Sequence, residues 1–94
     1  MVETSVPDHV LSHIELNQPQ LLSDIEPVQR YGRIRKYLLD ARQIKLETMR
    51  DMVSYACVAL IYRENFEVNP VIAALLEQVK RGELSFTQAM EEMP

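Results

Sequence analysis

The sequence predicts an all-α protein: one small domain of four to five helices packed around a central apolar helix at about residues 49–64. Three observations lead to this prediction. Apolar residues recur at steps of three and four along most of the chain, and no segment shows the alternation of a half-buried strand. Ten of the eleven residues in 52–62 are apolar or aromatic, so a helix there must be buried on most sides. With 94 residues, the chain has room for one domain.

The composition is that of a globular protein, with 47% hydrophobic and 26% charged residues. The central apolar run is shorter than the roughly 20 residues needed to cross a bilayer, so we expect no membrane association. The start Met1-Val-Glu-Thr-Ser has neither the basic cap nor the apolar core of a signal peptide. One cysteine cannot form an internal disulfide and fits a reducing compartment, so we expect a cytoplasmic protein.

The N-terminal part is expected to be the least regular. Residues 1–6 should form a loose terminus. Pro7 fits the first turn of a short helix from Asp8 to about Leu16. Residues 17–19 break that helix, and residues 20–26 should form a further helical turn or an ordered loop.

Pro27 suits the first position of a stronger helix, from Val28 to about Ile44. Gly32 inside this helix costs about 1 kcal/mol relative to alanine. That cost indicates a close approach of a neighbouring element, or a helix that begins later. The predicted apolar stripe is Val28, Tyr31, Ile34, Leu38, Ala41 and Ile44.

The central helix has a clear start signal. Thr48 is placed as its N-cap, and Asp51 as the acidic member of a capping box. The helix then runs from Met49 to about Glu64. Residues 65–70 follow as a turn-rich link, and its apolar anchors are expected to be Phe66 and Val68.

Two further helices complete the domain. Asn69 is a favourable N-cap and Pro70 a favourable first residue for a helix that runs to Arg81. Gly82 is placed to end it. A capping box over Ser85–Gln88 begins the last short helix. Its apolar residues, which would fold it back on the domain, are Leu84, Phe86, Ala89, Met90 and Met93.

The sequence offers no catalytic constellation. His9 and His13 are four residues apart and would share a helix face, but a metal site needs further ligands. We interpret them as surface residues. Cys57 lies among apolar neighbours, which suits a packing residue rather than a nucleophile. No carboxylate pair and no glycine-rich phosphate loop is present. We therefore predict no catalytic residue, no metal site and no cofactor, and a protein that is not an enzyme.

Charge is distributed unevenly along the chain, whose net charge is −4. Residues 28–50 carry seven basic and two acidic residues, whereas the segments on either side are acidic. These blocks can neutralise one another within the fold. Alternatively, the basic helix 28–45 could contact DNA phosphates in a regulator that resembles a helix-turn-helix protein. The apolar character of the next helix, the acidic total and the connector without glycine count against nucleic acid as the partner. The residues that would make these contacts are Arg30, Arg33, Arg35, Lys36, Arg42 and Lys45.

The second half carries a family resemblance, in the segments Asp51–Tyr62, Asn65–Leu76 and Gly82–Pro94. An acid opens an apolar helix, a turn with Phe and Pro follows, and then a Leu-Leu helix and a short amphipathic end. This pattern resembles the C-terminal helical end of effector adaptor (chaperone) proteins of bacterial type VI secretion, and related small proteins of the same gene neighbourhoods. The chain departs from the pattern at Arg63-Glu64, where the family typically has a glycine, and it lacks the adaptors' larger α/β region.

The resemblance implies a non-enzymatic protein-interaction module that helps to load or hold a secreted effector on its spike. Part of the apolar surface should then be exposed in the free protein and covered in the complex. Aromatic side chains suit such contacts, and methionine adapts to varied surfaces. The alternatives are a small immunity or antitoxin-type protein that binds a toxin, the DNA-binding regulator above, and self-association as a homodimer. The predicted partner-binding residues are Tyr55, Tyr62, Phe66, Met90 and Met93.

Overall fold

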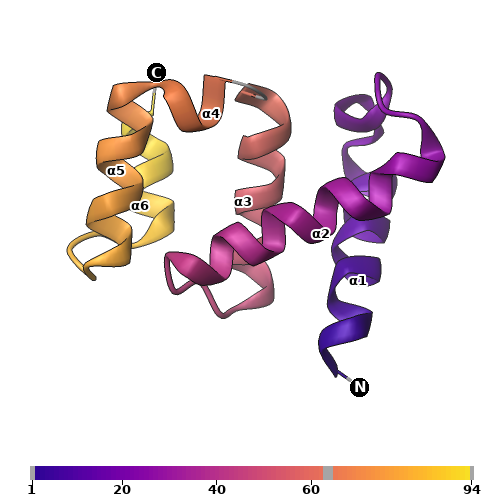
Figure 1. Ribbon diagram of the computed structural model, residues 1–94, viewed down its shortest axis with the longest axis horizontal. Helices are drawn as coiled ribbons and strands as arrows, with labels where there is room; N and C mark the ends of the chain where they lie inside the picture. Colours follow the sequence, from indigo (N-terminus) through magenta and orange to yellow (C-terminus); the bar gives the residue numbers. More distant parts are fainter. Residues whose placement is uncertain (1, 63–64, 94) are drawn as a thin grey trace.

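The computed structural model describes residues 2–62 and 65–93. Over these residues the chain is all-α, as predicted: it forms six α-helices, a short 3-10 helix (η1) and no strand (Figure 1). None of the described helices is both long and apolar enough to cross a membrane. The elements are α1 (Val2–Asn17), η1 (Pro19–Leu22), α2 (Pro27–Gln43), α3 (Met49–Tyr62), α4 (Asn65–Val68), α5 (Pro70–Lys80) and α6 (Phe86–Glu92).

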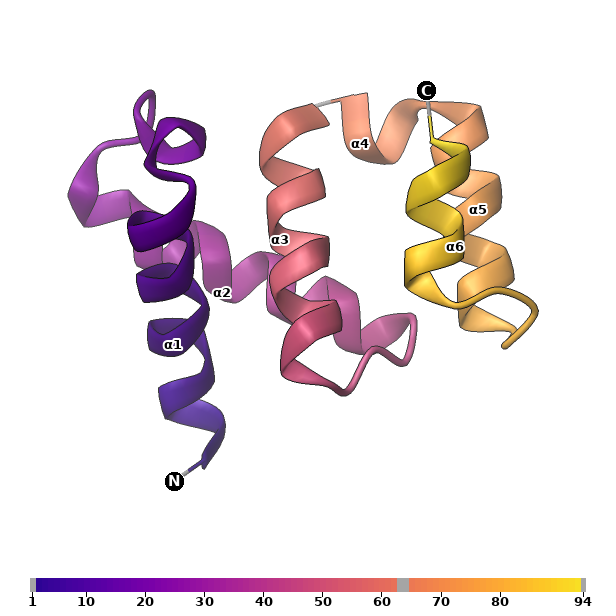
Figure 2. The same cartoon turned by 180° about the vertical axis from the view of Figure 1, so that it is seen from behind.

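Helix α3 is the centre of the fold. It packs against α1, α2, α4, η1 and α6, and α2 also crosses α1. Figures 1 and 2 show α1 on one side of α3 and the α5–α6 hairpin on the other. The radius of gyration is 12.8 Å, close to the value of about 13 Å expected for a compact chain of roughly this length. The predicted central position of this helix is therefore confirmed, although its last two expected residues, 63 and 64, lie outside the described residues.

The core continues across the molecule through an aromatic cluster. Tyr55 of α3 meets Phe66 of α4 edge to face, with ring centroids 5.1 Å apart. On α6, Phe86 lies 5.7 Å from the same tyrosine ring. Because these rings come from three different helices, the cluster fixes the C-terminal hairpin to the central helix. The buried residues of α3 are Met52, Tyr55, Ala56, Val58, Ala59 and Leu60.

The sequence misplaced two features of the chain. Helix α1 begins at Val2, so the expectation of a loose terminus over residues 1–6 is wrong for residues 2–6. Pro7 is expected in the first turn of a helix, but it lies inside α1, where its ring removes one backbone hydrogen bond and crowds the preceding turn. Val68 was expected to anchor the 65–70 link together with Phe66, but Val68 is exposed, whereas Phe66 is buried. Part of this link forms the single turn of α4.

Side chains cap the helices at the positions that the sequence indicated. The Thr48 hydroxyl accepts a hydrogen bond from the Asp51 amide at 3.1 Å. The Asn69 side chain accepts from two first-turn amides of α5. At α6 the Ser85–Gln88 capping box is complete, with reciprocal hydrogen bonds of 3.1 and 3.0 Å. Each cap contributes about 1 kcal/mol, so local signals set these boundaries.

Two helices end in the same way, with a residue in the left-handed conformation. Gly82 after α5 has φ 81°, and Lys45 after α2 has φ 68°. In both, the amide of the left-handed residue and the amide after it donate to carbonyl oxygens of the last turn, as in a Schellman motif. At the end of α2, Lys45 donates to Arg42 and Leu46 donates to Ala41. Lysine is unfavourable there, because its Cβ crowds the backbone in a conformation that glycine adopts freely.

We therefore expect the Lys45→Gly variant to unfold with a free energy about 1 kcal/mol higher than that of the unmodified chain, and the Gly82→Ala variant about 1 kcal/mol lower. Urea denaturation followed by circular dichroism measures both. Lys45→Ala is the matched control, since it removes the same charge but keeps a Cβ, and it should bring no gain. A similar gain for Lys45→Ala would show that charge, and not backbone conformation, limits stability at this position.

Candidate protein-binding surface

The five residues predicted to bind a partner do not form an exposed apolar face. Tyr55 and Phe66 are each 3% exposed, so the expectation of exposure is wrong for both. They are covered because Phe86, 31 residues from Tyr55 in sequence, packs on the same tyrosine ring. Tyr62, Met90 and Met93 are half-buried and pack against the core. Burial therefore removes Tyr55 and Phe66 from any binding surface, whereas the other three residues keep partial exposure.

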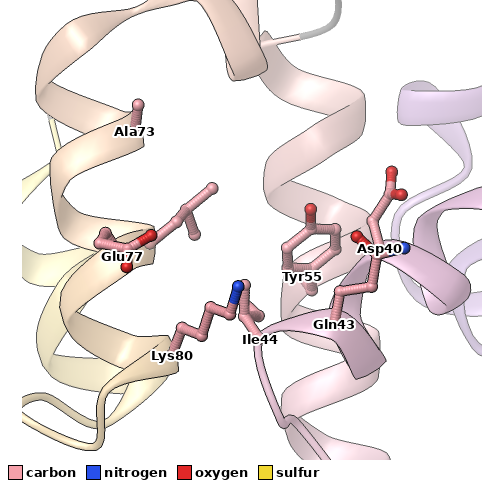
Figure 3. A pocket seen from close by; sticks show the side chains of 8 residues that line it. Asp40, Gln43, Ile44, Tyr55, Ala73, Glu77 and Lys80 are labelled. Atoms are coloured by element: carbon pink, nitrogen blue, oxygen red, sulfur yellow. The ribbon is translucent and has the colours of Figure 1, made fainter.

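A cleft of about 260 Å³ lies between the end of α2, the middle of α3 and α5. Figure 3 shows Glu77 and Lys80 on the α5 side, Asp40 and Gln43 on the α2 side, and the Tyr55 ring between them. Its polar lining consists of two carboxylates, one amine, the Gln43 amide and the Tyr55 hydroxyl, and it includes neither histidine nor cysteine. This set identifies no reaction, so the cleft carries no catalytic assignment.

The two candidate metal ligands lie four residues apart on α1. His9 and His13 are both exposed on α1. Within the part of the chain that the structure describes, no group of three or more His, Cys, Asp or Glu residues is arranged to hold a metal ion. The two histidines are thus placed as surface residues, in agreement with our interpretation of the sequence.

Cys57 is half-buried on α3, and this burial raises the pKa of its thiol. A raised pKa leaves less thiolate at any pH near neutrality, and the thiolate is the nucleophile. We expect iodoacetamide to alkylate the folded protein more slowly than the urea-unfolded chain at about pH 8, and the rate to rise with pH. Equal rates for folded and unfolded protein would contradict this assignment.

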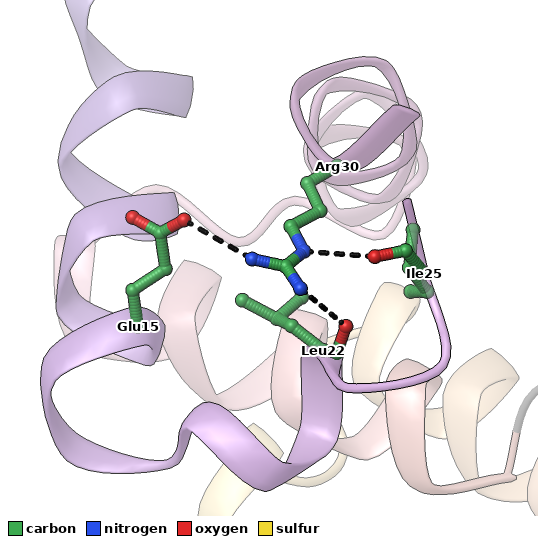
Figure 4. A network of polar contacts seen from close by, with 4 residues as sticks. All are labelled: Glu15, Leu22, Ile25 and Arg30. Carbon is green, nitrogen blue, oxygen red and sulfur yellow. Dashed lines mark hydrogen bonds and ion pairs between the residues drawn. The ribbon is translucent and has the colours of Figure 1, made fainter. Parts of the chain in front are cut away.

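One of the six basic residues singled out in the sequence has an internal role. Arg30 is half-buried and donates hydrogen bonds of 3.0 Å to the carbonyl oxygens of Leu22 and Ile25 (Figure 4). Its guanidinium also lies 3.7 Å from the Glu15 carboxylate of α1. Arg30 therefore ties the η1 segment to α2. At Arg30 a basic and an acidic segment therefore neutralise one another within the fold. Lys36 and Arg42 also take part in interactions within the chain. The side chains of the other five bases are exposed: Arg33, Arg35, Lys36, Arg42 and Lys45.

The structure also bears on the helix-turn-helix comparison, in which the helix after the turn enters the DNA groove. That helix would be α3, which is largely buried in the core. One stripe of α3 is half-buried or exposed. Its residues are mostly apolar and include one base: Arg50, Val53, Ser54, Cys57 and Ile61. This stripe is poorly suited to phosphate contacts, which require several basic side chains.

One face of α2 combines exposed apolar residues with positive charge. Val28 is 86% and Leu39 is 52% exposed. They are eleven residues apart, about three helical turns, so they lie on the same side of the helix. Gly32, Arg35 and Lys36 lie between them and are also exposed. We call these five residues the α2 outer face. It is opposite the buried residues of the same helix, which are Ile34, Tyr37, Leu38 and Ala41.

Gly32 has no role in packing within the described chain. A Cβ built on Gly32 would meet no atom within 4 Å. Helix α2 also begins at Pro27, well before the glycine. Both expectations for this residue are therefore wrong: no neighbouring element approaches it, and the helix does not begin later. An exposed glycine in a helix still costs about 1 kcal/mol relative to alanine.

We expect Gly32→Ala to raise the free energy of unfolding by about 1 kcal/mol, because the new methyl group points into open space and the unfolded chain loses conformational freedom. Chemical denaturation of the isolated protein measures the change. A lower stability for this variant would mean that Gly32 is required by the fold itself, and the argument for an external role would fail.

Comparison with protein-family models, with curated proteins and with solved structures finds no match to this chain.

Proposed function

We propose that the protein is a non-enzymatic interaction module that binds another protein through the α2 outer face. The observation that carries the proposal is Gly32, a costly helical glycine that lies between two exposed apolar side chains and whose added Cβ would meet nothing within 4 Å in the described part of the chain. A partner that packs on this face would bury Val28 and Leu39 and use the space that the missing side chain leaves. Burial of apolar surface is the main favourable term in protein association.

The same observation favours a protein over a nucleic acid. Val28 and Leu39 are the apolar part of this face, and phosphate groups gain nothing from contact with them. Protein surfaces that bind nucleic acids are instead dominated by basic and polar side chains. Arg35 and Lys36 lie beside the apolar residues and would set the orientation and the rate of association with a partner.

The identity of the partner is a narrower proposal. The resemblance of residues 47–94 to the helical end of type VI secretion adaptors supports a secreted effector as the partner. The single cysteine of the chain fits a cytoplasmic protein. The α2 outer face lies outside that segment. Binding through α2 and membership of a secretion system are therefore separate questions, and the experiment below addresses the first.

The test uses two exposed leucines that differ in position. Leu39 lies on the α2 outer face, whereas Leu16, which is 83% exposed, lies near the end of α1. The full chain and its Leu39→Glu and Leu16→Glu variants serve as baits in extracts of the cells that encode the protein. We expect the unmodified chain and the Leu16→Glu variant to retain the same protein from the extract, and the Leu39→Glu variant to lose it. Equal retention by both variants would refute binding through this face.

A further inference from the structure

We propose that the part of the partner that occupies the α2 outer face is an amphipathic helix with acidic residues along its flanks. This inference rests on the proposed function and specifies the chemistry of the partner. It follows from the shape of the face, from the backbone chemistry of a helix and from the arrangement of charge along α2.

The backbone of α2 restricts how a partner can bind. A partner strand adds to a sheet through main-chain hydrogen bonds, and it needs unpaired backbone groups at an edge. The 17-residue helix α2 uses its backbone groups internally along its length. Recognition must therefore come from side chains, and packing of one helix against another is the mode that side-chain ridges provide.

The spacing along the face suits a second helix. Val28, Gly32 and Leu39 follow one another at steps of four and seven residues, so they form a row on one side of α2. Glycine at the middle of the row leaves a gap between two side chains. A partner helix that crosses at Gly32 could lie at or below the usual interaxial distance of about 8–10 Å. Its own apolar residues would then contact Val28 on one side of the crossing and Leu39 on the other.

The charge on both sides of this row is positive. With about 100° between successive residues, Arg35 and Lys36 fall on opposite sides of the line from Gly32 to Leu39. The other exposed charges of α2, those of Arg33 and Arg42, are basic, and the acidic residue of this helix, Asp40, is half-buried. Flanking charges of this kind select partners of opposite sign, as at the edges of a coiled coil. A second copy that presented its own α2 would bring basic residues together, so a two-fold α2–α2 dimer is disfavoured.

Two synthetic helices test the inference directly. Each has about 21 residues and the same apolar stripe, but one carries glutamate and the other lysine on its flanks. Fluorescence anisotropy measures their binding to the full chain at about 20 and about 200 mM salt. We expect the acidic peptide to bind at least about tenfold more tightly than the basic one, with a difference that shrinks at the higher salt. No preference for the acidic peptide would overturn the inference.

Two pairs of variants locate the binding. Gly32→Leu should lower the affinity for the acidic peptide by about tenfold, because the leucine side chain fills the gap. Leu16→Glu on α1 should leave this affinity unchanged. Lys36→Glu should weaken it as well, whereas Lys80→Glu, which reverses an exposed base on α5, should not. Circular dichroism confirms that each variant is folded. Binding that survives both Gly32→Leu and Lys36→Glu would place the peptide elsewhere and overturn the inference.

A duplex DNA of about 20 base pairs is the competing ligand. If this DNA binds at about 20 mM salt, and if its affinity is lowered by Lys36→Glu but unchanged by Gly32→Leu, the face recognises phosphate and the inference is wrong. A third outcome is that neither peptide binds, while the capture experiment yields a protein that Leu39→Glu no longer retains. This result would refute an acidic helix as the occupant of the face and leave the proposed function intact. Failure of the capture experiment would instead refute the proposed function.

Discussion

Replacement of Phe86 by alanine is expected to lower the free energy of unfolding by about 3–5 kcal/mol. Phe86 is only 1% exposed and is the largest fully buried side chain in the described chain. Its removal leaves a cavity beside Tyr55 and detaches α6 from the central helix, because this ring is a main contact between them. A domain of this size has a total stability of about 5–14 kcal/mol, so the loss takes much of the available margin.

Urea denaturation followed by circular dichroism gives the change in stability for this variant. Phe86→Leu keeps most of the volume and should cost about 1 kcal/mol. Met90→Ala, at a half-buried position on the same helix, should also cost less than Phe86→Ala. A loss below about 1 kcal/mol for Phe86→Ala would mean that the C-terminal hairpin does not depend on this contact.

Arg30→Met is expected to cost about 2–3 kcal/mol, although Arg30 belongs to a helix whose other bases are mostly exposed. The variant removes the guanidinium donor from the carbonyl oxygens of Leu22 and Ile25, although the Ile25 amide still donates to the Leu22 carbonyl. A hydrogen bond from a charged donor contributes about 1.5–3 kcal/mol. Methionine keeps much of the volume, so the loss reports hydrogen bonding. The ion pair with Glu15 contributes little, because that carboxylate is 44% exposed and solvent screens the interaction.

Three comparisons separate these effects. Arg33→Met removes an exposed base from the same helix and should change the stability by less than about 0.5 kcal/mol. Glu15→Gln should cost less than about 1 kcal/mol. The loss in Arg30→Met should also persist at high salt, since hydrogen bonds to carbonyl groups are not screened as a surface ion pair is. Equal losses in Arg30→Met and Arg33→Met would show that Arg30 does not hold the η1 segment.

The fold followed from local signals to a large extent. The caps at Thr48, Asn69 and Ser85, and the stop at Gly82, are written in neighbouring residues, and the structure shows each of them. The end of α2 near Ile44 was also predicted, but the left-handed conformation of Lys45 was not, because lysine rarely adopts it. Local chemistry therefore predicts where these helices begin or end, whereas the backbone conformation at an end is predictable only when the favourable residue type is present.

The candidate surface was harder to predict, and α2 shows the reason. Val28 was assigned to the buried stripe because it precedes Ile34 by two steps of three residues. Each step of three falls about 60° short of a full turn, so Val28 lies about 120° from Ile34 around the helix axis. The structure accordingly exposes Val28. Gly32 was recognised as costly, but only the structure shows that no part of the described chain approaches it.

The burial of Tyr55 depends on a contact between distant parts of the chain. Its ring is covered by Phe66 and Phe86, which come from α4 and α6. Periodicity within a helix tells which residues share a face, but it does not tell which other helix covers that face. For this reason Tyr55 and Phe66, two of the predicted partner contacts, are core residues, and the exposed apolar residues of α2 were not predicted as a binding surface.

Site-specific crosslinking at position 39 tests the proposed binding surface most directly. A photoreactive amino acid replaces Leu39 in one variant and Glu91, an exposed residue of α6, in another, and both are irradiated inside the cells that encode the protein. We predict a discrete crosslinked protein from position 39, absent from position 91 and lost when Gly32→Leu is added. Crosslinks of equal yield and pattern at both positions, or none at position 39, would contradict the assignment of the α2 outer face as the binding surface.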